Sequence, residues 1–219
     1  FAEAHGNLGA AFRKLDRMEE AIASFRMALD IHPDIASTHF NLGNALRNLG
    51  QLDDAANSYR QAIAISPGIF QMHENLARTL HTLGHISDAA ASFENALAID
   101  PQAAGAHAGL ATLRMQQGRT DDAIDSYRRA VAIRPDFAEA HIELGTALKK
   151  KGLLDDAVAS FTRAIEIDPE IAIAHNNLGN ALADLGRTGD DVASYQKAIA
   201  LAPDFAQAHS NLGLALKVL

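Results

Sequence analysis

Asparagine recurs at one position of a 34-residue pattern, on segments that read as helices. Its members are Asn7, Asn41, Asn75, Asn177 and Asn211, and the row is interrupted by Gly109 and Glu143. A carboxamide both donates and accepts hydrogen bonds, so such a row can pair with the main chain of an extended peptide of any sequence. Asparagine is a poor residue for a helix interior, and its recurrence needs a reason. We expect peptide binding; the alternatives are bonding between neighbouring helices and a solvated polar face.

Further candidate peptide contacts lie close to this row. Asn44 and Asn180 follow members of it by three residues, and Phe40 and Arg47 stand on the same predicted helix as Asn41. Phe40, Ile142 and Ile173 are expected to face the groove and to anchor an apolar side chain of the ligand. Basic residues late on the same helices are either contacts for an acidic partner or, in the interpretation we favour, charges that complement the helix C-termini. They are Arg13, Lys14, Arg47, Lys149, Lys150 and Lys217.

A histidine register suggests metal binding, but its geometry argues against it. Its members are His5, His39, His73, His107, His141, His175 and His209. Equivalent residues lie on helices roughly 8–10 Å or more apart, whereas zinc holds its nitrogen ligands at about 2 Å. We therefore expect half-buried packing residues. His81 and His85 are interrupted by Gly84. No metal, cofactor or catalytic residue is expected, and the serine register (Ser24, Ser58, Ser92, Ser126, Ser160, Ser194) is interpreted as structural.

Composition excludes several classes of protein. The 219 residues carry a net charge of −8, no cysteine and no tryptophan, and 48% are hydrophobic. The apolar fraction excludes a disordered chain, and the lack of cysteine excludes a disulfide scaffold or a thiol nucleophile. Charge is dispersed without a basic block, so nucleic acid is not an expected partner. No apolar run approaches the length of a membrane span. A cytoplasmic location is expected.

The positions of the candidate residues are explained by repetition. Proline stands at Pro33, Pro67, Pro101, Pro135, Pro169 and Pro203, each 34 residues after the last. An aromatic register runs Phe25, Tyr59, Phe93, Tyr127, Phe161 and Tyr195. A fixed period of this length indicates a solenoid. One array over residues 1–219 is therefore predicted, with repeats 2–35, 36–69, 70–103, 104–137, 138–171 and 172–205 and a terminal helix 206–219.

Each repeat is predicted to contain two helices. In repeat two, the first helix runs from Ala36 to about Leu49, where Gly50 ends it in the left-handed conformation. Asp53 and Asp54 open the second helix as capping residues, and this helix ends near Ile65, before proline. Repeat one has Asp16 in place of the glycine, which tolerates that conformation less well.

Two positions depart from the repeat. Arg114 occupies a core register, and we expect its stem to pack while its head reaches solvent. Asp191 stands where every other repeat has alanine, and a buried unpaired carboxylate costs several kcal/mol. We therefore expect a local distortion or a displaced helix start beside Asp191.

The registers resemble tetratricopeptide (TPR) repeats over the whole chain. The residues that carry the resemblance in repeat two are His39, Leu42, Gly43, Leu46, Ala55, Tyr59, Ala62 and Pro67. The resemblance implies an all-α solenoid, a right-handed superhelix of antiparallel helix pairs. The family also includes a basic clamp for acidic C-termini, which is disfavoured here because the sites next to the histidine register carry no lysine or arginine.

A narrower resemblance is carried by the string His-x-Asn-Leu-Gly at His5, His39, His175 and His209, together with Pro-Asp-Phe-Ala. It resembles the repeat arm of O-linked N-acetylglucosamine transferases and their SPINDLY-like relatives. In those proteins an asparagine ladder binds the backbone of substrate polypeptides, and the resemblance implies that role for the row that begins at Asn7.

The expected function is a protein–protein interaction scaffold that binds an extended peptide or partner segment in a concave groove. One alternative is the substrate-recruiting arm of a SPINDLY-like protein O-glycosyltransferase; another is a scaffold that self-assembles by end-to-end stacking. The chain starts at Phe1, and the last helix keeps Leu212, Leu216 and Leu219 in core register. Both ends look cut, and apolar ends predict self-association.

Overall fold

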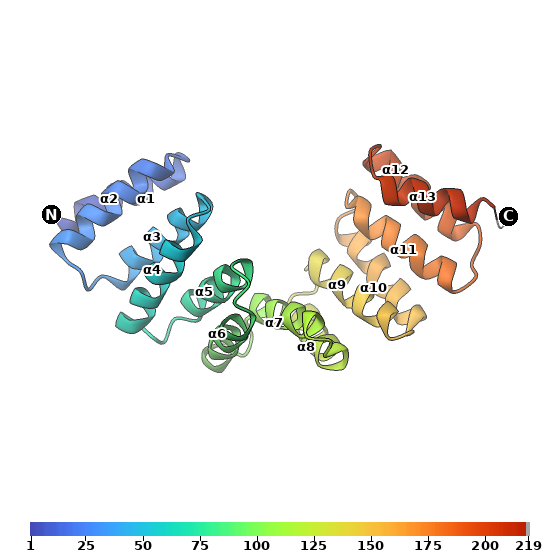
Figure 1. The fold of residues 1–219 in the computed structure, drawn as a ribbon, viewed down its shortest axis with the longest axis horizontal. Helices are drawn as coiled ribbons and strands as arrows, with labels where there is room; N and C mark the ends of the chain where they lie inside the picture. Colours follow the sequence, from blue (N-terminus) through green and yellow to red (C-terminus); the bar gives the residue numbers. More distant parts are fainter. Residues whose placement is uncertain (218–219) are drawn as a thin grey trace. The chain divides into compact units, whose positions relative to one another are not determined.

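The described part of the chain, residues 1–217 of the computed structural model, is entirely helical (Figure 1). Its contacts divide the chain into two compact units, of which the first comprises residues 1–113 and the second starts at Arg114. The helices are α1 Ala2–Lys14, α2 Met18–Ile31, α3 Ala36–Asn48, α4 Leu52–Ile65, α5 Phe70–Thr82, α6 Ile86–Ile99, α7 Ala104–Gln116, α8 Thr120–Ile133, α9 Ala138–Lys150, α10 Leu154–Ile167, α11 Ala172–Asp184, α12 Asp190–Leu201 and α13 Ala206–Ala215.

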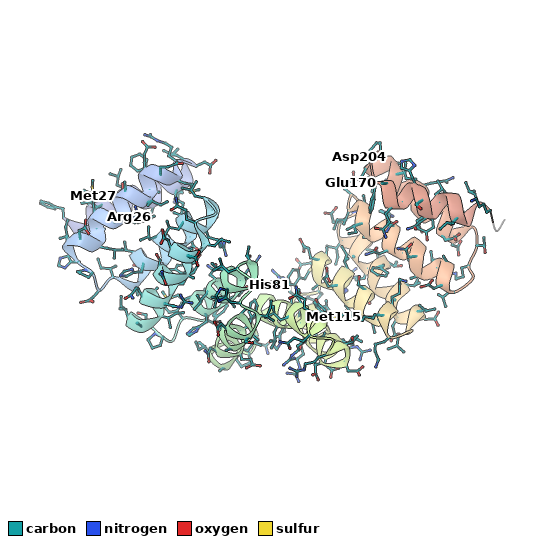
Figure 2. All side chains as sticks on the ribbon, viewed as in Figure 1. Arg26, Met27, His81, Met115, Glu170 and Asp204 are labelled. Carbon is teal, nitrogen blue, oxygen red and sulfur yellow. The ribbon has the colours of Figure 1, made fainter. Side chains whose placement is uncertain are left out.

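Each repeat is a pair of helices, as the sequence predicted. In repeat two, α3 ends at Asn48, one residue before the predicted end, and α4 ends at Ile65 as expected. Within each unit, a first helix packs on the second helix that follows it, and that second helix packs on the next first helix. Exposed side chains project from the second helices, as Arg26 and Met27 do from α2 (Figure 2).

Left-handed residues end the first helices. Gly50, Gly84, Gly118, Gly152 and Gly186 have φ between 71° and 81°, as predicted. Asp16 takes the same place in repeat one with φ of 60°, and it is the one non-glycine residue with positive φ in the described chain.

The aspartates that open the second helices do not cap them. In repeat two, α4 begins at Leu52, its N-cap residue Gln51 makes no side-chain capping bond, and Asp53 and Asp54 lie inside the first turn. The capping prediction is therefore wrong. The two carboxylates still lie at the positive end of the helix dipole, where negative charge is stabilising.

The core contains one aromatic ring per repeat, and in repeats one, two, five and six this ring lies against a glycine of the preceding first helix. Phe25, Phe93 and Phe161 are at most 1% exposed. A Cβ added at Gly43 would lie 2.7 Å from the ring of Tyr59, and Gly179 has the same relation to Tyr195 at 2.6 Å. Small residues therefore stand where the helices touch, which is how a chain poor in aromatic residues fills its interior.

The histidine and proline registers are parts of one contact. His39, His73, His107, His141, His175 and His209 each place Nε2 at 2.7–3.2 Å from the carbonyl oxygen of the proline six residues earlier. Because a carbonyl oxygen only accepts, Nε2 carries the hydrogen and donates it. Each histidine therefore joins the turn before a first helix to that helix. The serines are structural as expected: each hydroxyl donates to the carbonyl four residues earlier.

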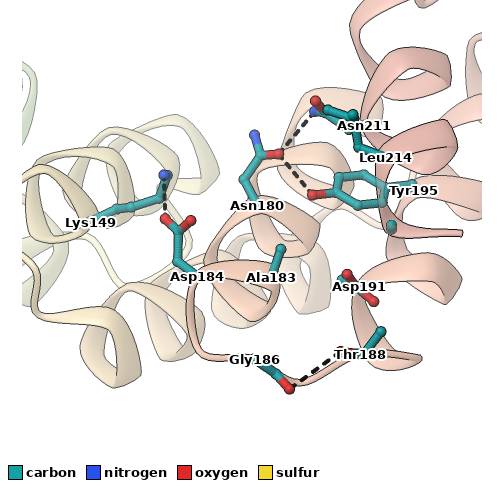
Figure 3. A pocket seen from close by; sticks show the side chains of 11 residues that line it. Lys149, Asn180, Ala183, Asp184, Gly186, Thr188, Asp191, Tyr195, Asn211 and Leu214 are labelled. Carbon is teal, nitrogen blue, oxygen red and sulfur yellow. Dashed lines mark hydrogen bonds and ion pairs between the residues drawn. The ribbon is translucent and has the colours of Figure 1, made fainter. Parts of the chain in front are cut away.

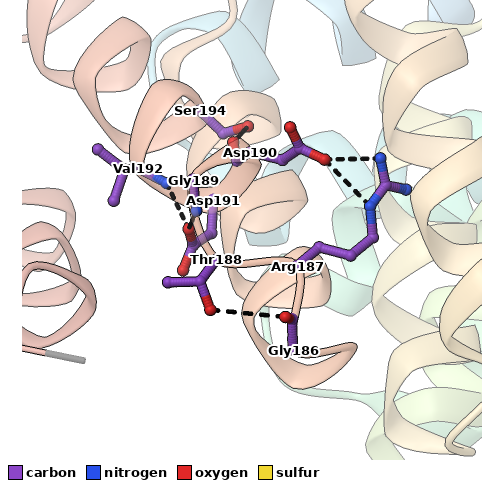
Figure 4. A network of polar contacts seen from close by, with 8 residues as sticks. All are labelled: Gly186, Arg187, Thr188, Gly189, Asp190, Asp191, Val192 and Ser194. Atoms are coloured by element: carbon purple, nitrogen blue, oxygen red, sulfur yellow. Dashed lines mark hydrogen bonds and ion pairs between the residues drawn. The ribbon is translucent and has the colours of Figure 1, made fainter. Parts of the chain in front are cut away.

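The expected displacement at Asp191 is confirmed (Figure 4). The second helix of repeat five starts at Leu154, whereas α12 starts at Asp190, two residues later than the equivalent position. Gly189 adopts φ of 111° before it. Asp191 is 3% exposed, and its Oδ1 accepts hydrogen bonds from the backbone N–H groups of Gly189 at 2.8 Å and Val192 at 2.7 Å.

The Arg114 head group makes hydrogen bonds within the chain that the sequence did not predict. The side chain is half-buried, and its guanidinium donates to the Ser126 hydroxyl and to the carbonyl oxygen of Asp122 on α8. The head lies along α8 because these two acceptors are within its reach.

The last helix is shorter than the predicted 206–219. α13 ends at Ala215, with Leu212 half-buried and Leu216 53% exposed. Leu219, the third predicted core leucine, lies outside the described residues, as does Val218.

Candidate functional site

Two asparagines of unit 1 meet on a buried tyrosine. The Tyr59 hydroxyl donates to Asn44 Oδ1 at 2.8 Å, and Asn75 Nδ2 donates to the same oxygen at 3.0 Å. Arg47 completes the group, because its guanidinium donates to Asn75 Oδ1 at 3.4 Å. The four side chains come from α3, α4 and α5, so they connect repeat two with repeat three.

The same arrangement recurs in unit 2 with different neighbours. Tyr195 donates to Asn180 Oδ1 at 2.9 Å, and Asn211 Nδ2 lies 2.9 Å from that oxygen (Figure 3). Asn211 Nδ2 also lies 3.0 Å from Asn176 Oδ1, and Asn176 is fully buried. Asn176 Nδ2 in turn donates to Asn177 Oδ1 at 3.3 Å.

The predicted asparagine row is therefore heterogeneous. Asn75 and Asn211 hydrogen-bond to asparagines of a neighbouring first helix, which is the inter-helix alternative raised by the sequence, whereas Asn177 bonds to Asn176 on its own helix. Asn7 is exposed and Asn41 is half-buried. The row thus contains amides with internal partners as well as an amide open to solvent.

The apolar candidates also differ from one another. Phe40 is half-buried and its ring centroid lies 5.9 Å from that of Tyr59. Ile142 is 7% exposed, so the expectation that it faces a ligand is wrong: it is part of the core. Ile173 is 51% exposed on α11.

Sequence reasoning missed the tyrosines and Asn176. The aromatic register alternates phenylalanine with tyrosine, and the residue 15 positions before each tyrosine is Asn44, Thr112 or Asn180. A buried phenolic hydroxyl needs a hydrogen-bond partner. The asparagine 15 residues before Tyr59 and before Tyr195 could therefore have been predicted from the sequence to bond the tyrosine hydroxyl. Nothing in the spacing marks Asn176.

Burial changes the titration of several groups near these sites. Desolvation raises the pKa of Tyr59 to about 12, against a smaller lowering effect of the positive charge of Arg47. Desolvation, followed by the negative charges of Asp191 and Asp184, raises the pKa of Tyr195 to about 12. Desolvation also raises the pKa of Glu143, which interrupts the asparagine row, and lowers the pKa of His141.

A pocket of about 360 Å³ opens beside Tyr195 in unit 2 (Figure 3). It is lined by Lys149, Asn180, Ala183, Asp184, Gly186, Thr188, Asp191, Tyr195, Asn211, Leu214 and Ala215. Its lining is therefore a mixture of amides, carboxylates and small residues. The Lys149 ammonium pairs with Asp184 at 2.7 Å.

Among residues 1–217, no three histidine, aspartate or glutamate side chains are grouped so that they could hold a metal ion. The helices within the same range include none with the length and hydrophobicity needed to cross a membrane.

The family follows from the helix pairs and their registers. The family model for the C-terminal TPR domain of cilia and flagella-associated protein 70 matches residues 2–214. The chain belongs to this family. Comparison with curated protein sequences found no match.

Solved structures share the TPR fold. YrrB, described as a TPR protein with an unusual peptide-binding site, has a TM-score of 0.70 and 24% identity, covering 89% of this chain and 98% of that one. MamA has a TM-score of 0.69 and 25% identity, covering 76% of this chain and 97% of that one. The pilF protein of Pseudomonas aeruginosa has a TM-score of 0.85 and 15% identity, covering 97% of both chains. The chain thus has the α-solenoid fold of TPR arrays.

Proposed function

We propose that this TPR array binds an extended peptide, or an extended segment of a partner protein, along its first helices. The observation that carries the proposal is the pocket beside Tyr195. It opens between α11, α12 and α13 and presents two asparagines, Asn180 and Asn211, at its wall. Small-molecule and side-chain pockets typically combine a recess of this size with a few fixed polar groups.

The hydrogen bonds around the pocket leave groups for a ligand. Asn180 uses Oδ1 for Tyr195 and Asn211, and within the described residues its Nδ2 has no partner. Asn211 uses Nδ2, and within the same residues its Oδ1 has none. One free donor and one free acceptor match the two kinds of group that a peptide main chain presents. Leu214, 60% exposed at the rim, adds apolar contact area.

The asparagines then have two roles. Asn44, Asn75, Asn180 and Asn211 hold neighbouring helices together and orient one another through their hydrogen bonds. Asn7 is exposed, so its side chain is open to a ligand. YrrB supports a peptide ligand by analogy of fold, since it is described as having a peptide-binding site.

The proposal is tested by selecting random linear peptides on the immobilised chain and mapping the enriched ones by NMR. We expect the bound peptides to shift the amide resonances of α11 and α13. Asn180→Ala should weaken them, while Asn57→Ala, at an exposed site on the second helix α4, should not. Failure to enrich any peptide, or shifts confined to the second helices, would contradict the proposal.

The two alternatives make different predictions. An arm of a protein O-glycosyltransferase requires binding to main chain along an uninterrupted row, and the bonds of Asn75 and Asn211 to other asparagines weigh against that. End-to-end assembly requires a particle size that grows with protein concentration, which light scattering measures directly.

A further inference from the structure

Repeats two and six present the same frame with different side chains around it. Asn44, Tyr59 and Asn75 correspond, four repeats later, to Asn180, Tyr195 and Asn211. Both groups make the same tyrosine-to-asparagine and asparagine-to-asparagine bonds. Several equivalent positions around the frame have changed; among them, Arg47 becomes Ala183, Leu52 becomes Thr188, Ala55 becomes Asp191 and Arg78 becomes Leu214.

In repeat two, an arginine of the chain itself lies beside the frame. The Arg47 side chain is half-buried, and its guanidinium donates to Asn75 Oδ1 at 3.4 Å. Its charge also acts on the neighbouring tyrosine, since it opposes the rise in the pKa of Tyr59. A guanidinium is thus accommodated next to this set of amides.

In repeat six, the corresponding space is a pocket. Ala183 lines it in place of an arginine, and Asn211, which also lines it, stands at the position of Asn75, whose Oδ1 accepts the Arg47 guanidinium. No hydrogen bond reaches Asn211 Oδ1 from any residue that the structure describes. The acceptor that binds a guanidinium in repeat two is therefore present here without one.

The sixth repeat also adds a carboxylate to this space. Asp191 lines the pocket and is 3% exposed, at a position where alanine serves in the other five repeats. Its Oδ1 accepts the backbone N–H groups of Gly189 and Val192, while its Oδ2 has no partner among residues 1–217. Asp191 thus offers the pocket one carboxylate oxygen that no described residue binds, and a cationic donor makes the stronger kind of hydrogen bond to such an oxygen.

The charges at the pocket favour a positively charged ligand. Lys149 contributes one positive charge, but its ammonium is held by Asp184 at 2.7 Å. Asp191 then remains as the uncompensated charge of the lining. The charges beside the two tyrosines have opposite signs: burial is the main cause of the raised pKa of both, but Asp191 and Asp184 add to the rise at Tyr195 whereas Arg47 opposes it at Tyr59.

We propose that the pocket beside Tyr195 receives the guanidinium of an arginine from the bound partner segment, which takes the place that Arg47 fills in repeat two. The inference rests on the proposed function, since it names the chemistry of that partner. Arginine suits the site better than lysine because its planar head presents several donors at once. These can serve the free oxygen of Asp191 and a neighbouring acceptor of the pocket wall together.

The test uses N-acetyl-arginine methylamide, with its citrulline and lysine counterparts as matched probes. Each is titrated into the whole chain to millimolar concentration and followed by the backbone and asparagine side-chain NMR signals. Citrulline keeps the shape of arginine and removes its charge. We expect the arginine probe to shift Asn180, Asn211 and Asp191 and to bind roughly tenfold or more tightly than citrulline, because a charge-assisted hydrogen bond is lost.

Three variants locate the effect. Asp191→Asn keeps an oxygen for the two backbone donors and removes the charge, so it should reduce arginine binding to the citrulline level. Ala183→Arg should fill the pocket from within and abolish binding. Ala193→Arg, which adds the same charge at an exposed site on α12 outside the pocket lining, should leave binding unchanged. Thermal melting of each variant confirms that it is folded.

Equal binding of the arginine and citrulline probes, equal binding of the arginine and lysine probes, or unchanged binding in Asp191→Asn would overturn the inference. Its failure is distinct from that of the proposed function. Enriched peptides that bind α11 and α13 without need of an arginine would leave the peptide-binding function standing and remove this pocket's role. If the arginine probe binds but the chain enriches no peptide, the pocket recognises a guanidinium and the peptide-binding function is contradicted.

Discussion

The Tyr59 hydroxyl donates its hydrogen to Asn44 Oδ1 at 2.8 Å, and Asn75 from the next repeat donates to that same oxygen. One carboxamide oxygen thus satisfies a buried phenol and binds two repeats together. Repeat one, which has Phe25 in the aromatic register, has Ala10 at the position of the asparagine. The hydroxyl and its acceptor are therefore present together or absent together in these two repeats.

A double-mutant cycle tests this coupling. Tyr59→Phe should cost about 1 kcal/mol of unfolding free energy for one lost hydrogen bond, and Asn44→Ala about 1–3 kcal/mol because it leaves the buried hydroxyl without a partner. The double variant, which reproduces the pair found in repeat one, should be destabilised by less than the sum. Urea unfolding gives the three values. Additive effects would show that the bond contributes nothing specific, and Phe25→Tyr, which adds a hydroxyl opposite Ala10, should be destabilising.

Glycine at the ring contacts is required by space. A methyl group at Gly43 would lie 2.7 Å from the Tyr59 ring, closer than carbon atoms approach. Gly43→Ala should therefore cost about 1–3 kcal/mol through overpacking. Gly6→Ala is the control, because its new methyl would meet Thr38 Oγ1 at an ordinary 3.7 Å. That change should stabilise α1 by up to about 1 kcal/mol through helix propensity, and circular-dichroism melts compare the two. Equal effects of the two substitutions would contradict the packing argument.

The tyrosines make stability depend on alkaline pH. Tyr59 and Tyr195 have pKa values raised to about 12 from an ordinary 10, so folding favours their neutral forms. Their contribution to stability is fully present below pH 10 and is lost as pH rises through the folded value near 12. Absorbance of tyrosinate against pH should show late ionisation in the folded chain and ordinary ionisation in urea. Early titration of all three tyrosines in the folded protein would be inconsistent with the buried hydroxyls.

Asp16 is expected to be a weak point of the first repeat. It adopts φ of 60°, where the other repeats have glycine. Asp16→Gly should raise the unfolding free energy by up to about 1 kcal/mol, since an L-residue is disfavoured in this conformation by about that amount. The reverse exchange Gly50→Asp, at φ of 73°, should be destabilising to a similar extent. Denaturant melts decide the matter, and a loss of stability in Asp16→Gly would show that the aspartate side chain has a role of its own.

The sequence predicted the helix pairs because their determinants are local and repeated six times. Glycine at the end of the first helix, proline after the second and the aromatic register each specify a backbone conformation or a core position within one repeat. Gly50 and Gly84 have the predicted left-handed conformation, and the start of α12 is displaced as Asp191 indicated. The capping role of Asp53 failed because a carboxylate at a helix start is stabilised by the dipole whether or not it caps.

The candidate site was harder to predict from the sequence because it depends on contacts between repeats. The row that contains Asn75 and Asn211 could be listed from spacing, but the direction of each amide depends on what the neighbouring repeat presents. Ile142 looked available to a ligand and lies in the core. The pocket is lined by Ala183, where repeat two has Arg47, and by Asp191, where the other repeats have alanine. A single repeat read alone shows neither.

The bonds from histidine to the preceding proline carbonyl have a consequence for how the chain can change in length. Each bond joins residues on opposite sides of a repeat boundary, as in Pro67 with His73 and Pro101 with His107. If residues 70–103 were excised, Pro67 would again stand six residues before a histidine, now His107. The new junction would re-form the bond without any compensating substitution. Duplication or loss of a whole repeat thus preserves this hydrogen bond at every repeat boundary. Such an array can evolve by changes in the number of repeats as well as by substitution of residues.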